Sequence, residues 1–157
     1  MESNNYQTPF SKALLTTVFT GFFSTIICLF YNLIYRQETG FEPSIIINVS
    51  SLIFGVNLFF LVTGMIYSGF IKMFKKADIL FIVIFSLLTI FFAWKAEGVN
   101  RSADHEISLQ FRGLLLGIIL IVGISVSFGV PFLFHNRKFN NTVLSFPFRL
   151  MLIFLLW

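Results

Sequence analysis

Acidic, basic and imidazole side chains gather in one stretch of an otherwise apolar chain, between Lys95 and Arg112. Within it, Asp104-His105-Glu106 offers the oxygen and nitrogen ligands that metal ions bind in proteins. Consecutive residues rarely point at one ion, however, and no His-Glu-x-x-His motif or spaced Cys/His set accompanies them. The pattern favours a solvated loop over a metal site, and we expect neither a catalytic group nor a bound metal or cofactor.

Glu97 and Arg101 lie four residues apart in the same stretch. If the preceding apolar helix continues that far, the two side chains share a helix face, and Glu97 also shares a face with Ser86 and Ala93. The spacing predicts an ion pair that caps the outer mouth of a helix bundle. The simpler alternative is an ordinary exposed ion pair, which contributes little to stability.

A single amide, Asn57, lies in the middle of the second apolar segment. An amide buried without a partner costs about 2–7 kcal/mol, so its side chain should face other helices. We favour an interhelical hydrogen bond. The alternative is a contact with a substrate or ion, in a pathway that Thr20 and Ser24 would also line. No carboxylate lies in the apolar middle of any segment, which argues against small multidrug-type antiporters, since those carry a membrane-embedded glutamate.

These polar groups must be positioned by elements that are themselves overwhelmingly apolar. Of the 157 residues, 57% are hydrophobic and only 11% are charged, and the mean hydropathy is +0.88. A soluble domain is about half apolar and about a quarter charged. So few charges cannot cover a surface that faces water, which predicts an integral membrane protein covered by lipid.

The net charge of +4 does not indicate a nucleic-acid partner. Nucleic-acid binding needs basic residues gathered on one face with polar or stacking groups between them. Here the basic residues stand in short runs between apolar segments, which is where topology determinants of membrane proteins lie.

Four apolar segments are long enough, or nearly so, to span a bilayer as helices: residues 13–35, 45–71, 79–96 and 113–134. Pro43-Ser44 suits the start of the second helix, and Pro131 predicts a kink or termination near the end of the fourth. Short connections predict an all-α, antiparallel four-helix transmembrane bundle over residues 1–138. The apolar tail, residues 139–157, is too short after Arg149 to span, so it is either an interfacial segment or a truncated fifth span.

The orientation follows from counting basic residues on the two sides. One side holds seven of the 11 lysines and arginines: Lys12, Lys72, Lys75, Lys76, Arg137, Lys138 and Arg149. The other side holds the remaining four: Arg36, Lys95, Arg101 and Arg112. Both termini are therefore predicted to be cytoplasmic, and small size with short loops favours the bacterial cytoplasmic (inner) membrane.

Small residues indicate where the helices should touch, because lipid tails are as apolar as leucine and helices associate through close packing. The first segment carries a stripe of Thr17, Thr20, Gly21, Ser24, Cys28 and Tyr31. In the fourth, Gly113 and Gly117 permit close approach of a neighbouring backbone. The first, second and fourth helices are predicted to be the most intimate, and the third to face mainly lipid.

Abundant packing surface and the scarcity of chemical motifs predict a small non-enzymatic membrane protein, structural or accessory, that packs with itself or with a larger membrane complex. The alternative is a transporter or channel subunit with a polar pathway near Asn57. A membrane enzyme that uses Glu97, Asp104 or His105 is the third possibility.

Overall fold

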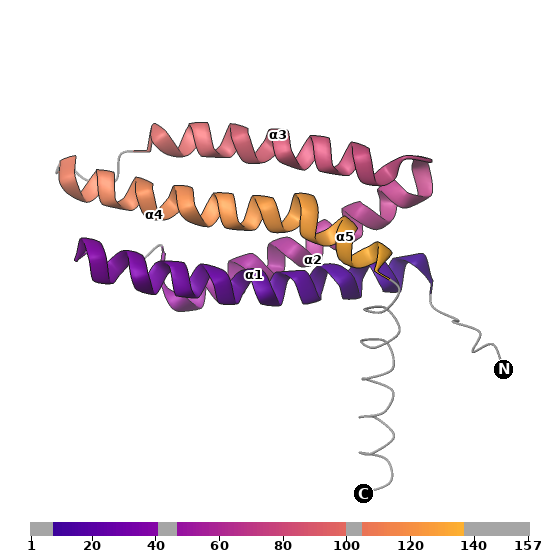
Figure 1. Cartoon of the computed structure of the whole chain (residues 1–157), viewed down its shortest axis with the longest axis horizontal. Coiled ribbons are helices and arrows are strands. Elements are labelled where there is room, and N and C mark those ends of the chain that lie inside the picture. The colour runs from indigo at the N-terminus through magenta and orange to yellow at the C-terminus, as the bar shows by residue number, and fades with distance from the viewer. Residues whose placement is uncertain (1–7, 41–46, 100–104, 137–157) are drawn as a thin grey trace, which may run out of the picture.

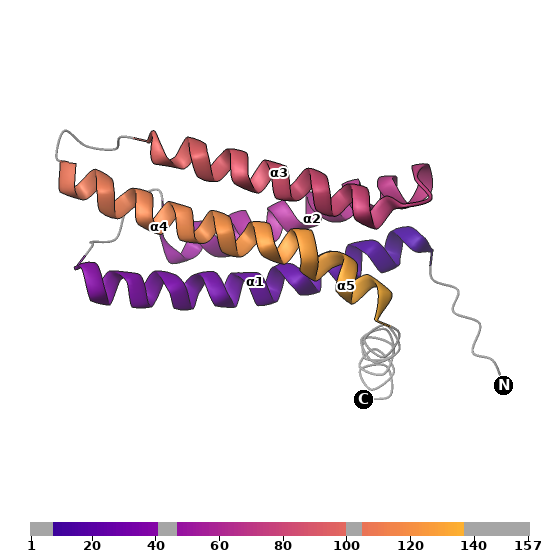
Figure 2. The same ribbon diagram turned by 45° about the horizontal axis from the view of Figure 1, so that its top comes forward.

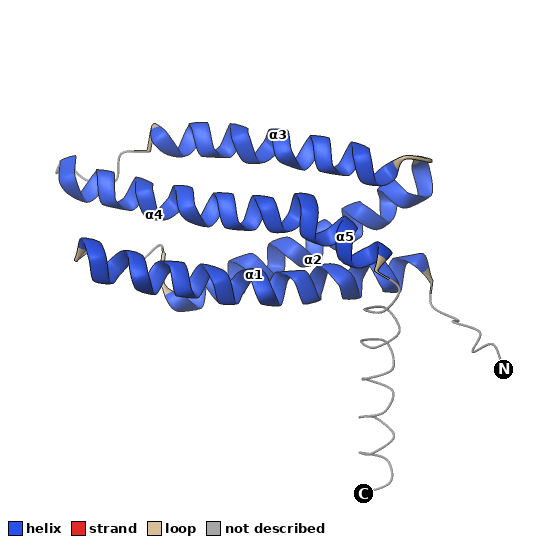
Figure 3. Cartoon of the chain, in the orientation of Figure 1, coloured by secondary structure: helices blue, strands red, loops and turns tan. Residues whose placement is uncertain are grey.

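The computed structural model describes residues 8–40, 47–99 and 105–136 (Figure 1). Its helices are α1 (Pro9–Thr39), α2 (Val49–Met73), α3 (Ala77–Glu97), α4 (His105–Ile124), the π-helical segment η1 (Ser125–Gly129) and α5 (Val130–His135). Within these ranges the chain is helical and contains no strand (Figure 3). Because α4, η1 and α5 are continuous, four helices are long and apolar enough to cross a membrane. This confirms the all-α class and indicates a small membrane protein.

The boundaries of α1 are marked by local capping. Thr8 accepts a hydrogen bond from the Ser11 backbone N–H, and Pro9 occupies the first turn, where its missing N–H costs nothing. At the other end Gly40 adopts a left-handed conformation with φ of 66° and donates to the Arg36 carbonyl. The 31 residues of α1 extend for ~46 Å at ~1.5 Å per residue, which exceeds the ~30 Å of a hydrocarbon core.

The second helix begins later than the sequence predicted. We expected a start at residue 45, but Ile47 and Asn48 are not helical, and α2 begins at Val49. Asn48 accepts a hydrogen bond from the Ser51 N–H at 2.8 Å, and the Ser51 hydroxyl accepts one from the Asn48 N–H at 3.0 Å. This reciprocal cap satisfies two free backbone donors, and it decides the start more strongly than Pro43-Ser44.

The fourth helix begins earlier than predicted, at His105 rather than at residue 113. Ser108, Phe111 and Leu114 recur at helical spacing and are buried, so packing on one side extends the helix into the polar stretch. His105 and Glu106 therefore belong to the first turn of α4 and not to the solvated loop that we expected there.

Pro131 does not end the fourth helix. The preceding five residues, Ser125–Gly129, widen into a π-helical turn, and the chain remains helical to His135. A proline lacks the N–H for the usual helical bond and its ring crowds the preceding turn, so a local widening accommodates it. Beyond this point α5 leaves the line of α4, as the change of direction in Figure 2 shows.

The closest helix contacts use small residues as predicted, but one helix pairing was wrong. The most extensive contacts join α1 to α2, and α3 packs mainly on α4 and η1, whereas α2 touches α4 little. A Cβ on Gly21 would lie 2.7 Å from that of Phe60 in α2, so these two helices meet without space for a methyl group. The space beside Gly123 of α4 is similarly occupied by Thr89, so it is α3 and not α2 that packs closely on α4 there. Residue size on the partner helix decides this choice.

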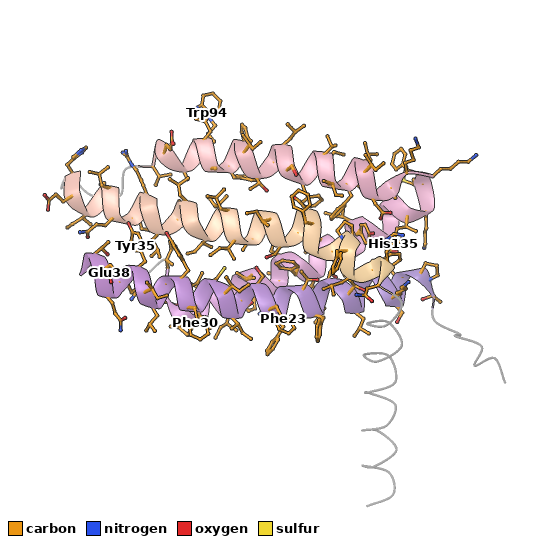
Figure 4. All side chains as sticks on the ribbon, in the orientation of Figure 1. Phe23, Phe30, Tyr35, Glu38, Trp94 and His135 are labelled. Carbon is orange, nitrogen blue, oxygen red and sulfur yellow. The ribbon has the colours of Figure 1, made fainter. Side chains whose placement is uncertain are left out.

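Large apolar side chains cover the outside. Phe30 is 62% exposed and Trp94 is 71% exposed, and both point away from the other helices (Figure 4). α3 is the least buried of the four long helices, in agreement with its scarcity of small and polar residues. An apolar exterior of this extent requires a hydrocarbon environment.

Candidate functional site

A phenol, a carboxylate and an imidazole from three helices meet at the end of the molecule where α2 turns into α3. The Tyr67 hydroxyl donates to Asp78 Oδ1 at 2.5 Å, and Asp78 Oδ2 lies 3.5 Å from His135 Nε2. Tyr67 belongs to α2, Asp78 to the first turn of α3, and His135 to the last turn of α5. We call these three residues the Tyr67–Asp78–His135 cluster.

The local sequence explains how Asp78 reaches this position. α2 ends at Met73, a short turn carries Lys75 and Lys76, and α3 starts at Ala77. An acidic residue in the first turn of a helix is favoured by the helix dipole. The same turn directs Asp78 back towards Tyr67, eleven residues earlier in the chain.

His135 bridges two acceptors. Its Nδ1 lies 3.2 Å from the Pro131 carbonyl oxygen, while its Nε2 faces Asp78. A carbonyl and a carboxylate both only accept hydrogen bonds, so each contact needs its donor on a His135 ring nitrogen. The side chains of His135 and Asp78 are 64% and 36% exposed, respectively. The ion pair therefore lies at the water-facing edge of the cluster.

Aromatic rings surround the buried part of the cluster. Tyr67 is fully buried, and its ring packs edge-on against Phe81 at 4.7 Å and Phe134 at 5.3 Å between centroids. The Lys12 ammonium of α1 lies 4.3 Å from the centre of the Phe134 ring on its other flank, a cation–π contact. All four long helices thus contribute to this end of the bundle (Figure 4).

The cluster can hold helix ends together, but it offers little more chemistry. Serine, threonine and cysteine nucleophiles are absent from it, and within residues 8–40, 47–99 and 105–136 no three His, Cys, Asp or Glu side chains gather as metal ligands. Sequence reasoning used Asp78 only as a topology marker. The feature that identifies it is an acid in the first turn of α3, eleven residues after the tyrosine of α2.

Asn57 lies in the interface between α1 and α2. Its amide donates to the Thr25 hydroxyl at 3.1 Å and to the Ile53 carbonyl at 2.7 Å. Thr25 in turn donates to the Gly21 carbonyl at 2.8 Å. The structure therefore places Asn57 in an interhelical hydrogen bond, whose contribution to function stays a prediction.

Thr20 and Ser24 are both buried on the inner side of α1. The Thr20 hydroxyl donates to the carbonyl of Thr16 at 2.8 Å, one turn earlier in the same helix. The Ser24 hydroxyl and that of Ser127 in η1 are buried without a hydrogen-bond partner in the part of the chain that the structure describes. Neither Thr20 nor Ser24 forms a hydrogen bond with Asn57. The side-chain partner of Asn57 is Thr25.

Gly113 and Gly117 receive aromatic rings rather than a neighbouring backbone. A Cβ on Gly117 would overlap the ring of Tyr31, and one on Gly113 would overlap the hydroxyl of Tyr35. The Tyr31 hydroxyl donates to the Gly113 carbonyl at 3.0 Å, and that of Tyr35 to the Gln110 carbonyl at 2.9 Å. The two glycines therefore form a recess on α4 for two tyrosines of α1, a use that a glycine spacing alone does not reveal.

The structure describes only one member of the predicted outer-mouth ion pair, Glu97. Glu97 is the last residue of α3 and is exposed, so it does not face the bundle interior as we expected. Its partner Arg101 and the neighbouring Asp104 lie outside the described residues. His105 is exposed at the start of α4.

No protein-family model, curated protein or solved structure matches this chain.

Proposed function

We propose that this chain is a small non-enzymatic integral membrane protein, structural or accessory in role, that packs with itself or with a larger membrane complex. The observation that supports the proposal is the hydrogen bonding of Asn57, the amide in the middle of α2. Both of its amide hydrogen bonds end on protein atoms, the Thr25 hydroxyl and the Ile53 carbonyl. An amide nitrogen committed in this way holds two helices together, and its donors are not available to a passing substrate.

The hydroxyl groups near it support the same reading. Thr16, Thr17, Thr20, Thr25 and Thr63 all donate to carbonyls of their own helix, three or four residues earlier. Hydrogen bonds of this kind satisfy the hydroxyl without a water-filled space. The interface between α1 and α2 is thus built as a dry, closely packed seam.

The proposal includes an arrangement in the membrane. The helices form an antiparallel bundle in the bacterial cytoplasmic membrane, with the Tyr67–Asp78–His135 cluster and both termini on the cytoplasmic side. Lys12, Lys72, Lys75 and Lys76 all lie near this cluster end, which supports the assignment through the excess of basic residues in cytoplasmic loops. The tail, residues 139–157, expected to be either an interfacial segment or a truncated fifth span, lies outside the described residues.

The second candidate is a transporter or channel subunit. It is favoured by the two buried hydroxyls of Ser24 and Ser127, which lack a protein partner within the described ranges. In membrane proteins, polar groups that the protein leaves unsatisfied often line a pathway for water, ions or polar substrates.

Thiol labelling separates these two functions. Cys28 is the sole cysteine, so a Cys28→Ser background allows single cysteines to be introduced by Asn57→Cys and Thr20→Cys. A membrane-impermeant maleimide reacts with thiolates in water and not with thiols in a dry interface. Labelling of Glu38→Cys, at the exposed end of α1, provides the positive control.

A structural or accessory protein should show labelling at Glu38→Cys alone. Labelling of Asn57→Cys or Thr20→Cys from an aqueous side would reject the dry seam in favour of a transport pathway. Native electrophoresis of the chain from its own membrane tests the remaining part. A discrete species larger than the monomer is expected, and migration as a free monomer at native expression would contradict the accessory role.

A further inference from the structure

An apolar groove opens on the side of the bundle and is lined by residues of α2, α3, α4 and η1. Its volume is about 300 Å³. Val56, Phe85 and Val126 form a buried floor, while Phe59, Leu88 and Phe92 stand exposed around the opening. The hydroxyl of Thr89 is the one polar side-chain group among the described residues of the lining, and it already donates to the Phe85 carbonyl at 2.7 Å.

The groove exists because glycine occupies one of its walls. A Cβ on Gly55 would meet nothing within 4 Å, so this part of α2 has no neighbouring helix. On the opposite side Gly123 lets Thr89 of α3 approach α4 closely, which holds α3 away from α2. The resulting space extends for ~10 Å along α3, from Phe85 to Phe92, at ~1.5 Å per residue.

The residues that follow the groove in α3 indicate how deep in the membrane the groove lies. Trp94 projects outward (Figure 4), and tryptophan and lysine at the end of an apolar helix mark the membrane interface. Lys95 follows Trp94 directly. Phe92 lies two residues before Trp94, ~3 Å along the helix axis at ~1.5 Å per residue. The groove therefore begins just under the interface and continues into the hydrocarbon.

Among the described residues at this end, Lys95 is the cation that makes no hydrogen bond or ion pair to the rest of the fold. Arg36 donates to the Ile47 carbonyl at 2.8 Å, and Arg112 donates to the Val99 carbonyl at 2.8 Å, so both hold connecting segments. Lys95 has no salt bridge within the described chain, and its ammonium lies 5.8 Å from the centre of the Phe91 ring. It shares the face of Leu88 and Phe92, at the interfacial end of the groove.

We infer that this groove binds one acyl chain of a bilayer phospholipid, whose phosphate pairs with Lys95. The site has the apolar lining and depth that a hydrocarbon chain requires, and a cation where the headgroup would lie. This inference is separate from the accessory role, because it holds whether or not a partner protein exists.

Photo-crosslinking in nanodiscs tests the site. The full chain is reconstituted with phosphatidylglycerol that carries a diazirine in the upper part of one acyl chain, and cross-linked residues are mapped by mass spectrometry. Cross-links should concentrate on the lining residues of the groove, such as Phe85, Leu88, Phe92, Ile118 and Val122. Their yield should lie well above that at Leu87, which does not line the groove and is 62% exposed. A uniform yield over groove and exterior would overturn the inference.

Gly55→Leu supplies the decisive variant, because Gly55 lines the groove and a Cβ there would meet nothing within 4 Å. The matched control is Gly69→Leu, at an equally open glycine of α2 that does not line the groove. The yield in the groove should fall to the Leu87 level in Gly55→Leu and stay unchanged in Gly69→Leu. Equal yields in all three proteins would reject the site.

Lys95→Gln tests the headgroup contact without altering the lining. Loss of one interfacial cation should lower the yield in the groove about fivefold, the effect of one lysine near an anionic surface. An unchanged yield would reject the phosphate contact. Protein–protein cross-links from the groove to the tail or to another copy, in place of lipid, would reject the acyl chain as occupant.

Discussion

The Tyr67 hydroxyl of α2 donates to the Asp78 carboxylate of α3 at 2.5 Å. The two residues stand on either side of the turn between the helices, and the same carboxylate faces His135 at 3.5 Å. One acidic side chain therefore links the ends of α2, α3 and α5. Because Tyr67 is fully buried and Asp78 is partly exposed, the two partners should respond differently to substitution.

Substitution of Tyr67 and Asp78 should reveal a coupled pair. Asp78→Ala leaves a buried phenol hydroxyl without its acceptor, and we expect a loss of about 1–3 kcal/mol in the free energy of unfolding. Tyr67→Phe removes the donor and leaves a carboxylate that water still reaches, so its cost should be smaller, about 1 kcal/mol. Unfolding in mixed micelles measures both.

The double variant provides the control for this pair. In Tyr67→Phe with Asp78→Ala, the loss should be smaller than the sum of the two single losses, because the hydrogen bond can be broken only once. Strictly additive losses would show that the contact contributes nothing measurable.

Gly21→Ala should weaken the seam between α1 and α2. The new methyl group would lie 2.7 Å from the Cβ of Phe60, an atom next to the backbone that cannot rotate away, so the helices must separate. Overpacking of this kind costs about 1–3 kcal/mol. Gly55→Ala is the matched control, since its methyl group meets nothing within 4 Å. Equal thermal stability of both variants would contradict the close approach at Gly21.

Gly117→Ala should displace Tyr31 from its recess on α4. The methyl group would overlap the tyrosine ring, which is held by a 3.0 Å hydrogen bond to the Gly113 carbonyl. We expect a loss of about 1–3 kcal/mol from the overlap. A second substitution, Tyr31→Leu, removes the ring and should recover part of that loss. If Tyr31→Leu instead adds its own full cost, the two residues are not in contact.

Asn57→Leu should be tolerated. Thr25 keeps its 2.8 Å hydrogen bond to the Gly21 carbonyl, so no buried group is left without a partner. Interhelical hydrogen bonds in membranes are worth about 0.6 kcal/mol on average, and the loss of unfolding free energy should be of that order. Mobility in native electrophoresis should match that of the unsubstituted chain. Loss of the larger species would show that Asn57 contacts a partner directly.

Local rules account for most of the helix boundaries. The Thr8 cap and Gly40 enclose α1 at positions that their chemistry requires. The start of α2 could also be predicted from local sequence, since Asn48 and Ser51 have the spacing of a reciprocal cap. Pro43-Ser44 offered an alternative start for the same helix. The start of α4 could not, because burial of Phe111 and Leu114 by other helices holds that first stretch in helical form.

The amino-acid sequence by itself determined the class of molecule and the number of long helices, because length and apolar composition decide both without reference to partners. Only the tertiary structure decided that α3 packs on α4, that Gly113 and Gly117 receive tyrosine rings, and that Tyr67, Asp78 and His135 meet. These facts depend on which side chains face each other across helices that are far apart in the chain. Helical periodicity defines the face of each residue, but the shapes of the opposing surfaces select its partner.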